Sequence, residues 1–374
     1  MSKKKSDLQI AQEQAESAIK KTNEKIEELG KYTSNLYSAL NNIQKLFDKI
    51  RNVPSEKHLE YRKLKEVRLN WKQQVEKIES DYKNAVAKNA GKGIAGVGTG
   101  VAVAALGPTA AMGIATTFGV ASTGTAISAL SGAAATNAAL AWLGGGAIAT
   151  GGGGIAAGNA FLALAGPVGW AIAGIALLGS GLLFWKTKSD QNRLEDIFTF
   201  ISKRDITSYE LAIVELNERI SRIKDESVKL NDAIEKIESF GVDYNQMTEA
   251  QQYELGAYVN LMSASTQLLV NPILGLQPKY NEEDFSKFVS EGNRTTYEAL
   301  CYSHKDLIIA LSNLLYKIDL DDKDKKLLRK SFKKNKKFLS SMNISGFDDI
   351  ILDIVCEALY LKYYPSTQTS STVY

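Results

Sequence analysis

The sequence predicts an all-α protein: a long, coiled-coil-like helical bundle with an apolar Gly/Ala-rich helical hairpin or multi-helix membrane insert. Three observations lead to this fold class. Apolar residues recur at spacings of three and four over long stretches on both sides of the middle of the chain, as in amphipathic helices. Residues 93–185 contain no Asp, Glu, Lys or Arg. The chain has only six prolines and little of the apolar/polar alternation that is typical of strands.

The composition excludes several classes of protein. The net charge of +3, from 45 Lys and Arg against 42 Asp and Glu, is too small for a strongly basic nucleic-acid coat, so we expect no nucleic-acid partner. The only two cysteines, Cys301 and Cys356, exclude a disulfide scaffold, and two histidines leave little material for a metal site. The 374 residues are enough for two or three domains.

The first predicted domain, residues 1–92, is a long helical hairpin, and its charged start MSKKKSD predicts no signal peptide. From about residue 6 to Arg51 the positions of one helix face lie three or four apart: Ile19, Thr22, Ile26, Leu29, Thr33, Leu36, Leu40, Ile43, Phe47 and Ile50. Proline at position 54 ends this helix, and Ser55 is suited to cap the next one. We expect the second helix, over 55–90, to fold back with its apolar positions at Leu64, Val67, Trp71, Val75, Ile78 and Tyr82.

Residues 93–185 form the second predicted domain, a charge-free membrane-insertion segment. A buried helix in water keeps a charged, solvated face, whereas the interior of a bilayer disfavours charge throughout. Of these 93 residues, 22 are Gly and 26 are Ala, so neighbouring helices can approach backbone to backbone. The strongest candidate span covers 161–185. Roles in insertion and helix packing are expected for Gly96, Gly100, Gly154, Gly158, Pro167, Trp170 and Trp185.

Basic residues flank the charge-free segment on both sides: Lys83, Lys88, Lys92, Lys186, Lys188 and Arg193. The positive-inside rule then places both ends of the segment on one side of the membrane, which predicts two or four passes. Two other interpretations stay open, a static membrane anchor and an apolar hairpin buried within a soluble bundle. The buried hairpin is also a suitable resting state for a protein that inserts later.

Residues 186–241 are expected to form one long amphipathic helix that packs on the N-terminal hairpin. Its face repeats the three-four spacing: Ile206, Tyr209, Ile213, Leu216, Ile220, Ile223, Ser227, Leu230, Ile234 and Ile237. A C-terminal domain, 242–364, holds shorter helices, of which one begins at Thr248 with Gln251 in a capping box and one begins near Asn281. Further helices are predicted over 294–318, 322–341 and 346–363, followed by a disordered tail, 365–374.

The stretch 323–337 carries nine basic residues interleaved with Leu327, Leu328 and Phe332. As a helix it has a basic face that suits anionic lipid headgroups, although a merely solvated charged face is the simpler interpretation. The candidates for headgroup contact are Lys186, Lys188, Lys326, Arg329, Lys330 and Lys333.

The remaining motifs predict no enzyme and no cofactor. Residues 91–96 match G-x-G-x-x-G, but they follow a charged helix instead of a strand, and no acidic residue stands about twenty residues later. Cys301 and His304 share a helix face without a third group to orient them. Residues 319–324 lack the glycine and the glutamate of a calcium loop, so we expect them to begin a helix.

The arrangement of long helices at 6–51, 55–90 and 190–240 around an apolar, glycine-rich insert resembles α-helical pore-forming toxins of the cytolysin A type, including the Bacillus haemolysin and non-haemolytic enterotoxin components. The resemblance covers residues 6–240 as a pattern, without a specific motif. It implies a rod-like bundle that hides its apolar hairpin until a membrane releases it.

The expected function is therefore membrane insertion with pore formation or permeabilisation, by a toxin or effector that is membrane-associated or converts from a soluble to a membrane-bound form. Its expected partners are the lipid bilayer, further copies of the same chain and a second protein component. The alternative is a non-lytic, membrane-anchored coiled-coil scaffold.

Overall fold

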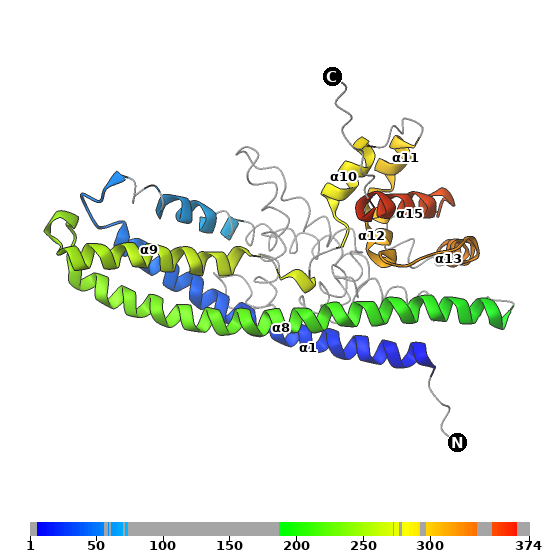
Figure 1. Ribbon diagram of the computed structural model, residues 1–374, viewed down its shortest axis with the longest axis horizontal. Helices are drawn as coiled ribbons and strands as arrows, with labels where there is room; N and C mark the ends of the chain where they lie inside the picture. The colour runs from blue at the N-terminus through cyan, green and yellow to red at the C-terminus, as the bar shows by residue number, and fades with distance from the viewer. Residues whose placement is uncertain are drawn as a thin grey trace, which may run out of the picture.

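The computed structural model describes residues 6–55, 59, 61–69, 72–73, 187–271, 273–276, 279–291, 297–334 and 346–364. Over these ranges the protein is all-α, as predicted, with no strand (Figure 1). The charge-free segment 93–185, the tail 365–374 and most of the predicted second helix lie outside the described residues.

Helix α1, Asp7–Phe47, begins with a capping box in which the backbone of Gln9 donates to the Ser6 side chain and the backbone of Ser6 donates to the Gln9 side chain. Its buried face follows the predicted spacing and includes Thr22, Ile26, Leu29, Thr33, Leu36, Leu40 and Ile43. The helix ends before the predicted Arg51, because the Arg51 backbone pairs with the chain that follows the next long helix. Its N–H donates to the Val242 carbonyl at 2.8 Å.

Helix α8, Lys188–Phe240, packs along α1, and the two helices run parallel (Figure 1). Near the middle of the pair, Lys224 Nζ lies 3.4 Å from Glu28 Oε1, across a sequence separation of 196 residues. At the far end, Asn52 Nδ2 donates to Asp243 Oδ1 at 3.0 Å, across 191 residues. The nearly constant separation shows that α1 and α8 start at one end of the molecule and finish together at the other.

The buried face of α8 confirms much of the predicted spacing. Tyr209, Leu216, Ile220, Ile223, Leu230 and Ile237 are buried, whereas Ile206, Ile213, Ser227 and Ile234 are only half-buried. Ala212 and Ala233 take buried positions that the prediction did not include. At Ala212 the small side chain allows the backbone of Gly275 to approach α8 closely.

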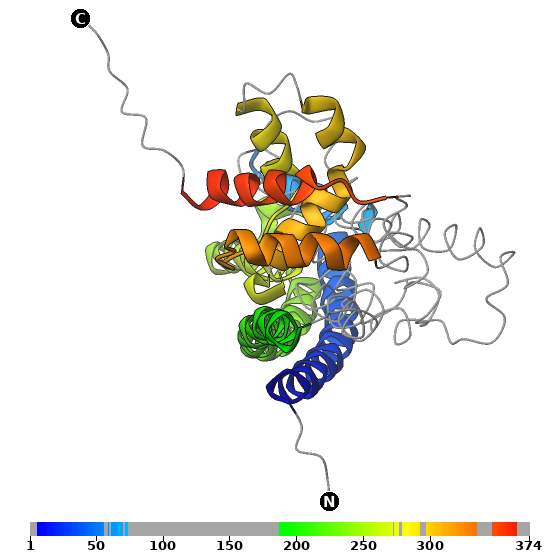
Figure 2. The same ribbon diagram turned by 90° about the vertical axis from the view of Figure 1, so that its right-hand side faces the viewer.

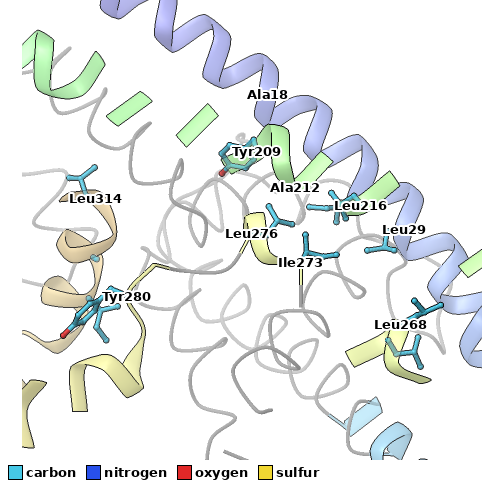
Figure 3. Packing of buried hydrophobic residues seen from close by; sticks show 14 of the residues in the cluster. Ala18, Leu29, Tyr209, Ala212, Leu216, Leu268, Ile273, Leu276, Tyr280 and Leu314 are labelled. Carbon is cyan, nitrogen blue, oxygen red and sulfur yellow. The ribbon is translucent and has the colours of Figure 1, made fainter. Parts of the chain in front are cut away.

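After Gly241 and the short 3-10 helix η3, Tyr244–Gln246, the chain reverses into α9, Glu249–Val270. The predicted capping box of Thr248 and Gln251 is confirmed. Helix α9 runs back along α8, and Arg219 of α8 donates to the carbonyls of Leu268 and Asn271 at its end, at 2.8 and 2.9 Å. Figure 3 shows the 3-10 helix η4, Leu274–Leu276, packed beside Ala212 and Leu216.

Residues 61–69 are helical, as predicted, and lead back from the end of α1 (Figure 1). The predicted inward position of Val67 is wrong, because its side chain is 38% exposed. Tyr61 and Arg68 face the bundle instead, and the Arg68 guanidinium donates to Thr266 Oγ1 at 3.1 Å and to Gln44 Oε1. The polar partners on α1 and α9 explain why an arginine, instead of an apolar residue, is buried at position 68. Burial lowers the pKa of Arg68 to about 10.

The C-terminal helices form a separate cluster whose members are α10, Glu282–Glu291; α11, Glu298–Ser303; α12, Lys305–Leu315; α13, Asp322–Lys334; and α15, Ile350–Tyr363. Asn281 begins α10, as predicted, because its side chain accepts from the Asp284 backbone at 2.9 Å. The single helix predicted over 294–318 is wrong. The chain breaks at His304, where φ is −120° and ψ is 21°, and the imidazole Nδ1 lies 2.9 Å from Ser303 Oγ.

Arg204 of α8, paired with Asp205, contacts the C-terminal cluster. The Arg204 guanidinium lies 2.7 Å from Asp205 Oδ1, donates to the carbonyls of Leu314 and Tyr316 at the end of α12, and stacks 3.9 Å from the centre of the Tyr316 ring. Asp205 is fully buried, and its second carboxylate oxygen has no hydrogen-bond partner among the described residues. Burial raises the pKa of Asp205 to about 6, although Arg204 opposes the rise.

The close contact at Gly275 predicts that Gly275→Ala is destabilising. A Cβ atom at this position would lie 2.6 Å from both the Ala212 nitrogen and the Ser208 carbonyl oxygen of α8, and backbone atoms cannot move aside as a flexible side chain can. We expect a loss of roughly 1–3 kcal/mol in the free energy of unfolding, measured by chemical denaturation. Gly256→Ala is the matched control, because open space surrounds this helical glycine, and should gain about 1 kcal/mol. Equal stabilities for the two variants would contradict the close packing of η4.

The Asp205 carboxyl predicts a specific dependence of stability on pH. Because its pKa in the folded protein, about 6, lies above the ordinary value, its stabilising contribution is complete below about pH 4 and is lost as the pH rises through 6. Relative to Asp205→Asn, the wild-type free energy of unfolding should therefore fall by roughly 2–3 kcal/mol between pH 4 and pH 7.5. Denaturant titrations of both proteins across this range measure the difference, which would be flat if Asp205 stayed ionised.

Candidate functional site

The charge-free segment joins the described structure at Thr187, where α8 begins. The Thr187 side chain caps this helix by accepting from the Asp190 backbone at 3.3 Å. Lys188 is exposed at the first helical position. The Thr187 hydrogen bond, together with Lys323, lowers the pKa of Asp190. The start of α8 is therefore an ordered helix end that connects directly to the apolar segment, and we take it as the candidate functional site.

Helix α13 is docked at this same end of α8. Its Lys323 Nζ lies 3.3 Å from Asp190 Oδ1, and Arg193 of α8 forms ion pairs with both Asp321 and Asp324. Figure 2, which looks onto this end of the molecule, shows α13 lying across α8. These contacts bring the predicted basic helix next to the junction with the charge-free segment, although more than 130 residues separate Arg193 from Asp324 in sequence.

Asp321 and Asp324 also start α13. The backbone of Asp324 donates to Asp321 Oδ1 at 2.8 Å, and the backbone of Asp321 donates to Asp324 Oδ2 at 3.2 Å. The prediction that residues 319–324 begin a helix is confirmed, and the guanidinium of Arg193 binds these carboxylates. Within the described ranges, no group of three or more His, Cys, Asp or Glu side chains is arranged to hold a metal ion.

The predicted headgroup candidates on α13 differ in their surroundings. Arg329 donates to Asp353 Oδ1 at 2.6 Å, and Lys333 Nζ lies 2.7 Å from Asp349 Oδ2, so both are engaged with the start of α15. Lys326 and Lys330 are exposed. The apolar side chains Leu327, Leu328 and Phe332 are buried in the protein. Helix α13 can therefore offer a membrane its lysine side chains but not an apolar face.

The other predicted site residues lie outside the described residues: Gly96, Gly100, Gly154, Gly158, Pro167, Trp170, Trp185 and Lys186. The site residue that the sequence reasoning missed is Arg193, which it counted as a basic flank of the charge-free segment. The structure pairs Arg193 with two carboxylates, and the Asp324 hydrogen bond raises its pKa. The three-residue spacing of Asp321 and Asp324 indicates a helix start, but nothing in the sequence connects this start to α8.

Comparisons with protein-family models, curated proteins and solved structures find no match for this chain. Among the helices that the structure describes, none is both long and apolar enough to cross a bilayer.

The ion pairs of Arg193 predict that Arg193→Ala loosens α13 from α8. Asp324 is almost fully buried, so loss of the guanidinium leaves its carboxylate without its main partner. We expect at least severalfold faster hydrogen exchange of the α13 amides, with little change in the middle of α1, as measured by mass spectrometry. The matched control is Arg222→Ala on the same helix, whose pair with Glu218 is exposed and 3.8 Å long. Exchange as slow in Arg193→Ala as in this control would show that α13 is held by its apolar contacts alone.

Proposed function

We propose that the protein inserts residues 93–185 into a lipid bilayer and forms a pore as an oligomer, with the helical bundle as its frame outside the membrane. The observation that carries this proposal is the 93-residue run without a charged side chain, which joins α8 directly at its capped start. Half of the run consists of Gly and Ala. That composition suits close contact between helices better than strong anchoring of one helix in hydrocarbon.

The parallel pairing of α1 and α8 supports this arrangement. The 41 residues of α1 span about 60 Å, and the chain must return over at least this distance before α8 begins, because α8 extends past the start of α1 (Figure 1). The predicted helix over 55–90 would cover about 55 Å in that direction. Both ends of the charge-free segment would then lie at the same end of the bundle, as an even number of membrane passes requires.

The position of α13 would add electrostatic attraction between the protein and an anionic membrane surface. Because Lys323 pairs with Asp190, the exposed Lys326 and Lys330 belong to a helix that lies beside the start of α8. Lysines at such a position attract anionic headgroups by about 1 kcal/mol each near a membrane surface. The lysines at 186 and 188 would act at the same level.

The glycines of the charge-free segment predict a test of pore formation. Replacing both Gly154 and Gly158 by Leu should reduce dye release from liposomes at least severalfold, because the larger side chains separate helices that would otherwise touch. Membrane partition, measured by liposome flotation, should not fall, because Leu is more hydrophobic than Gly. The matched control replaces Ala156 and Ala160 by Leu, which adds similar bulk about half a turn away.

Three outcomes of this experiment would contradict parts of the proposal. Partition into liposomes without dye release by the wild type would identify a non-lytic anchor instead of a pore. Equal release by the glycine and alanine variants would exclude specific packing at Gly154 and Gly158. A variant lacking 93–185 that still floats with liposomes in high salt would place the anchor outside the charge-free segment.

A further inference from the structure

A cavity of about 500 Å³ lies in the C-terminal cluster, between the end of α12, the start of α13 and the last turns of α15. Figure 1 shows these three helices together on one side of α8, with α13 lying beside it. The apolar part of the lining consists of Leu315, Ile318, Leu320 and Leu359. Cavities of roughly 300–1,000 Å³ with apolar walls and a few polar groups are typical of small-molecule sites.

Two lysines on the cavity lining stand out among the cations of this cluster. Lys323, Arg329 and Lys333 each form an ion pair with a nearby aspartate. Lys317 and Lys325 line the cavity, and neither side chain forms an ion pair or hydrogen bond within the described structure. Asp319 also lines the cavity, but it forms an ion pair with neither lysine, so the lining carries two cations against one carboxylate. A net positive charge beside apolar walls favours an anionic ligand.

The backbone at Lys317 gives a second, independent observation. Its φ of 58° lies in the left-handed region, which lysine adopts rarely and glycine adopts easily. The residue follows Tyr316, the C-cap of α12, at a position where glycine is the usual choice. The backbone conformation therefore gives no reason for a lysine at position 317. A role for its side chain, which lines the cavity, does give one.

Aromatic side chains cover one wall of the cavity. Tyr360 and Tyr364 stack with ring centres 5.5 Å apart, and both side chains are more than 60% exposed, at 63% and 68%. Exposed aromatic rings beside an apolar lining provide further contact area for the body of a ligand.

We propose that this cavity binds an anionic amphiphile, whose phosphate or carboxylate head lies between Lys317 and Lys325 and whose apolar body lies on the leucine and tyrosine side chains. The same chemistry occurs in a lipid taken from a bilayer and in a free soluble amphiphile. The inference is independent of membrane insertion by residues 93–185, because every residue that carries it belongs to the C-terminal cluster.

Binding of decyl phosphate to the full-length protein tests the proposal, measured by calorimetry below the concentration at which the probe forms micelles. Lys317→Gly and Lys325→Gln should each bind about tenfold more weakly, because each removes one charged partner of the phosphate. Lys287→Gln is the matched control, because Lys287 is an exposed lysine of the same cluster, on α10, but does not line the cavity. Lys317→Gly should also unfold at a higher denaturant concentration, which separates loss of binding from loss of folding.

A second measurement locates the bound probe. Cys356 lines the cavity, whereas Cys301 is buried elsewhere and the charge-free segment contains no cysteine. Decyl phosphate should therefore slow the reaction of Cys356 with a small maleimide, followed by mass spectrometry at pH 8, while Cys301 serves as the internal reference. Lys317→Gly should lose this protection at the same probe concentration.

The possible results of these two experiments distinguish between the proposal and its alternatives. Equal binding by the wild type and both cavity variants, or equal protection of Cys356 by uncharged decanol, would overturn the proposal. Protection of Cys356 by vesicles that contain phosphatidic acid would support it and identify a bilayer lipid as the source. Protection by decyl phosphate but not by these vesicles would support it with a free amphiphile as the ligand.

Discussion

The parallel pairing of α1 with α8 is the contact on which the rest of the structure depends. Each helix buries one long face, and the contact between α1 and α8 is the most extensive between any two helices that the structure describes. Helix α9 and η4 then pack on α8, and residues 61–69 contact α1 and α9. If α1 and α8 slid along each other, their buried faces would no longer match. The backbone bridge between Arg51 and Asp243 would be lost as well.

Three arginines of α8 fasten other helices to this pair. Arg219 binds the last carbonyls of α9, Arg204 binds the last carbonyls of α12, and Arg193 binds the carboxylates that begin α13. Spacings of 11 and 15 residues place these side chains on neighbouring parts of one helix face. Arg219 and Arg204 therefore satisfy carbonyls that a helix end leaves without intrahelical partners, whereas Arg193 pairs with the two carboxylates that cap α13. The surroundings of the start of α8 and the cavity of the C-terminal cluster both depend on these three arginines, because they position α12 and α13.

The sequence predicted the long helices well because their apolar spacing persists over many turns, as at Leu216, Ile223 and Leu230. The capping box at Thr248 was also readable, since capping is a local interaction. The buried contacts of Arg68, Arg193 and Arg204 could not be predicted, because the partners of each arginine are distant in sequence. The break at His304 was missed for a related reason: the surrounding Leu and Ile residues fit one continuous helix as well as two. Of the two cavity lysines, Lys325 belongs to the basic stretch 323–337, but nothing in the sequence placed it at a cavity. Lys317 had no sequence signal, because its position depends on a backbone angle.

The separation of about 190 residues between paired positions of α1 and α8 has a consequence for synthesis. Helix α1 leaves the ribosome about 140 residues before α8 begins. At 5–20 residues per second this corresponds to a delay of roughly 7–28 s. During that time the apolar face of α1 has no α8 to cover it, and the entire charge-free segment is synthesised. A nascent chain with two uncovered apolar regions is a substrate for chaperones. The order of the helices along the sequence therefore makes synthesis the stage at which this protein exposes the most apolar surface.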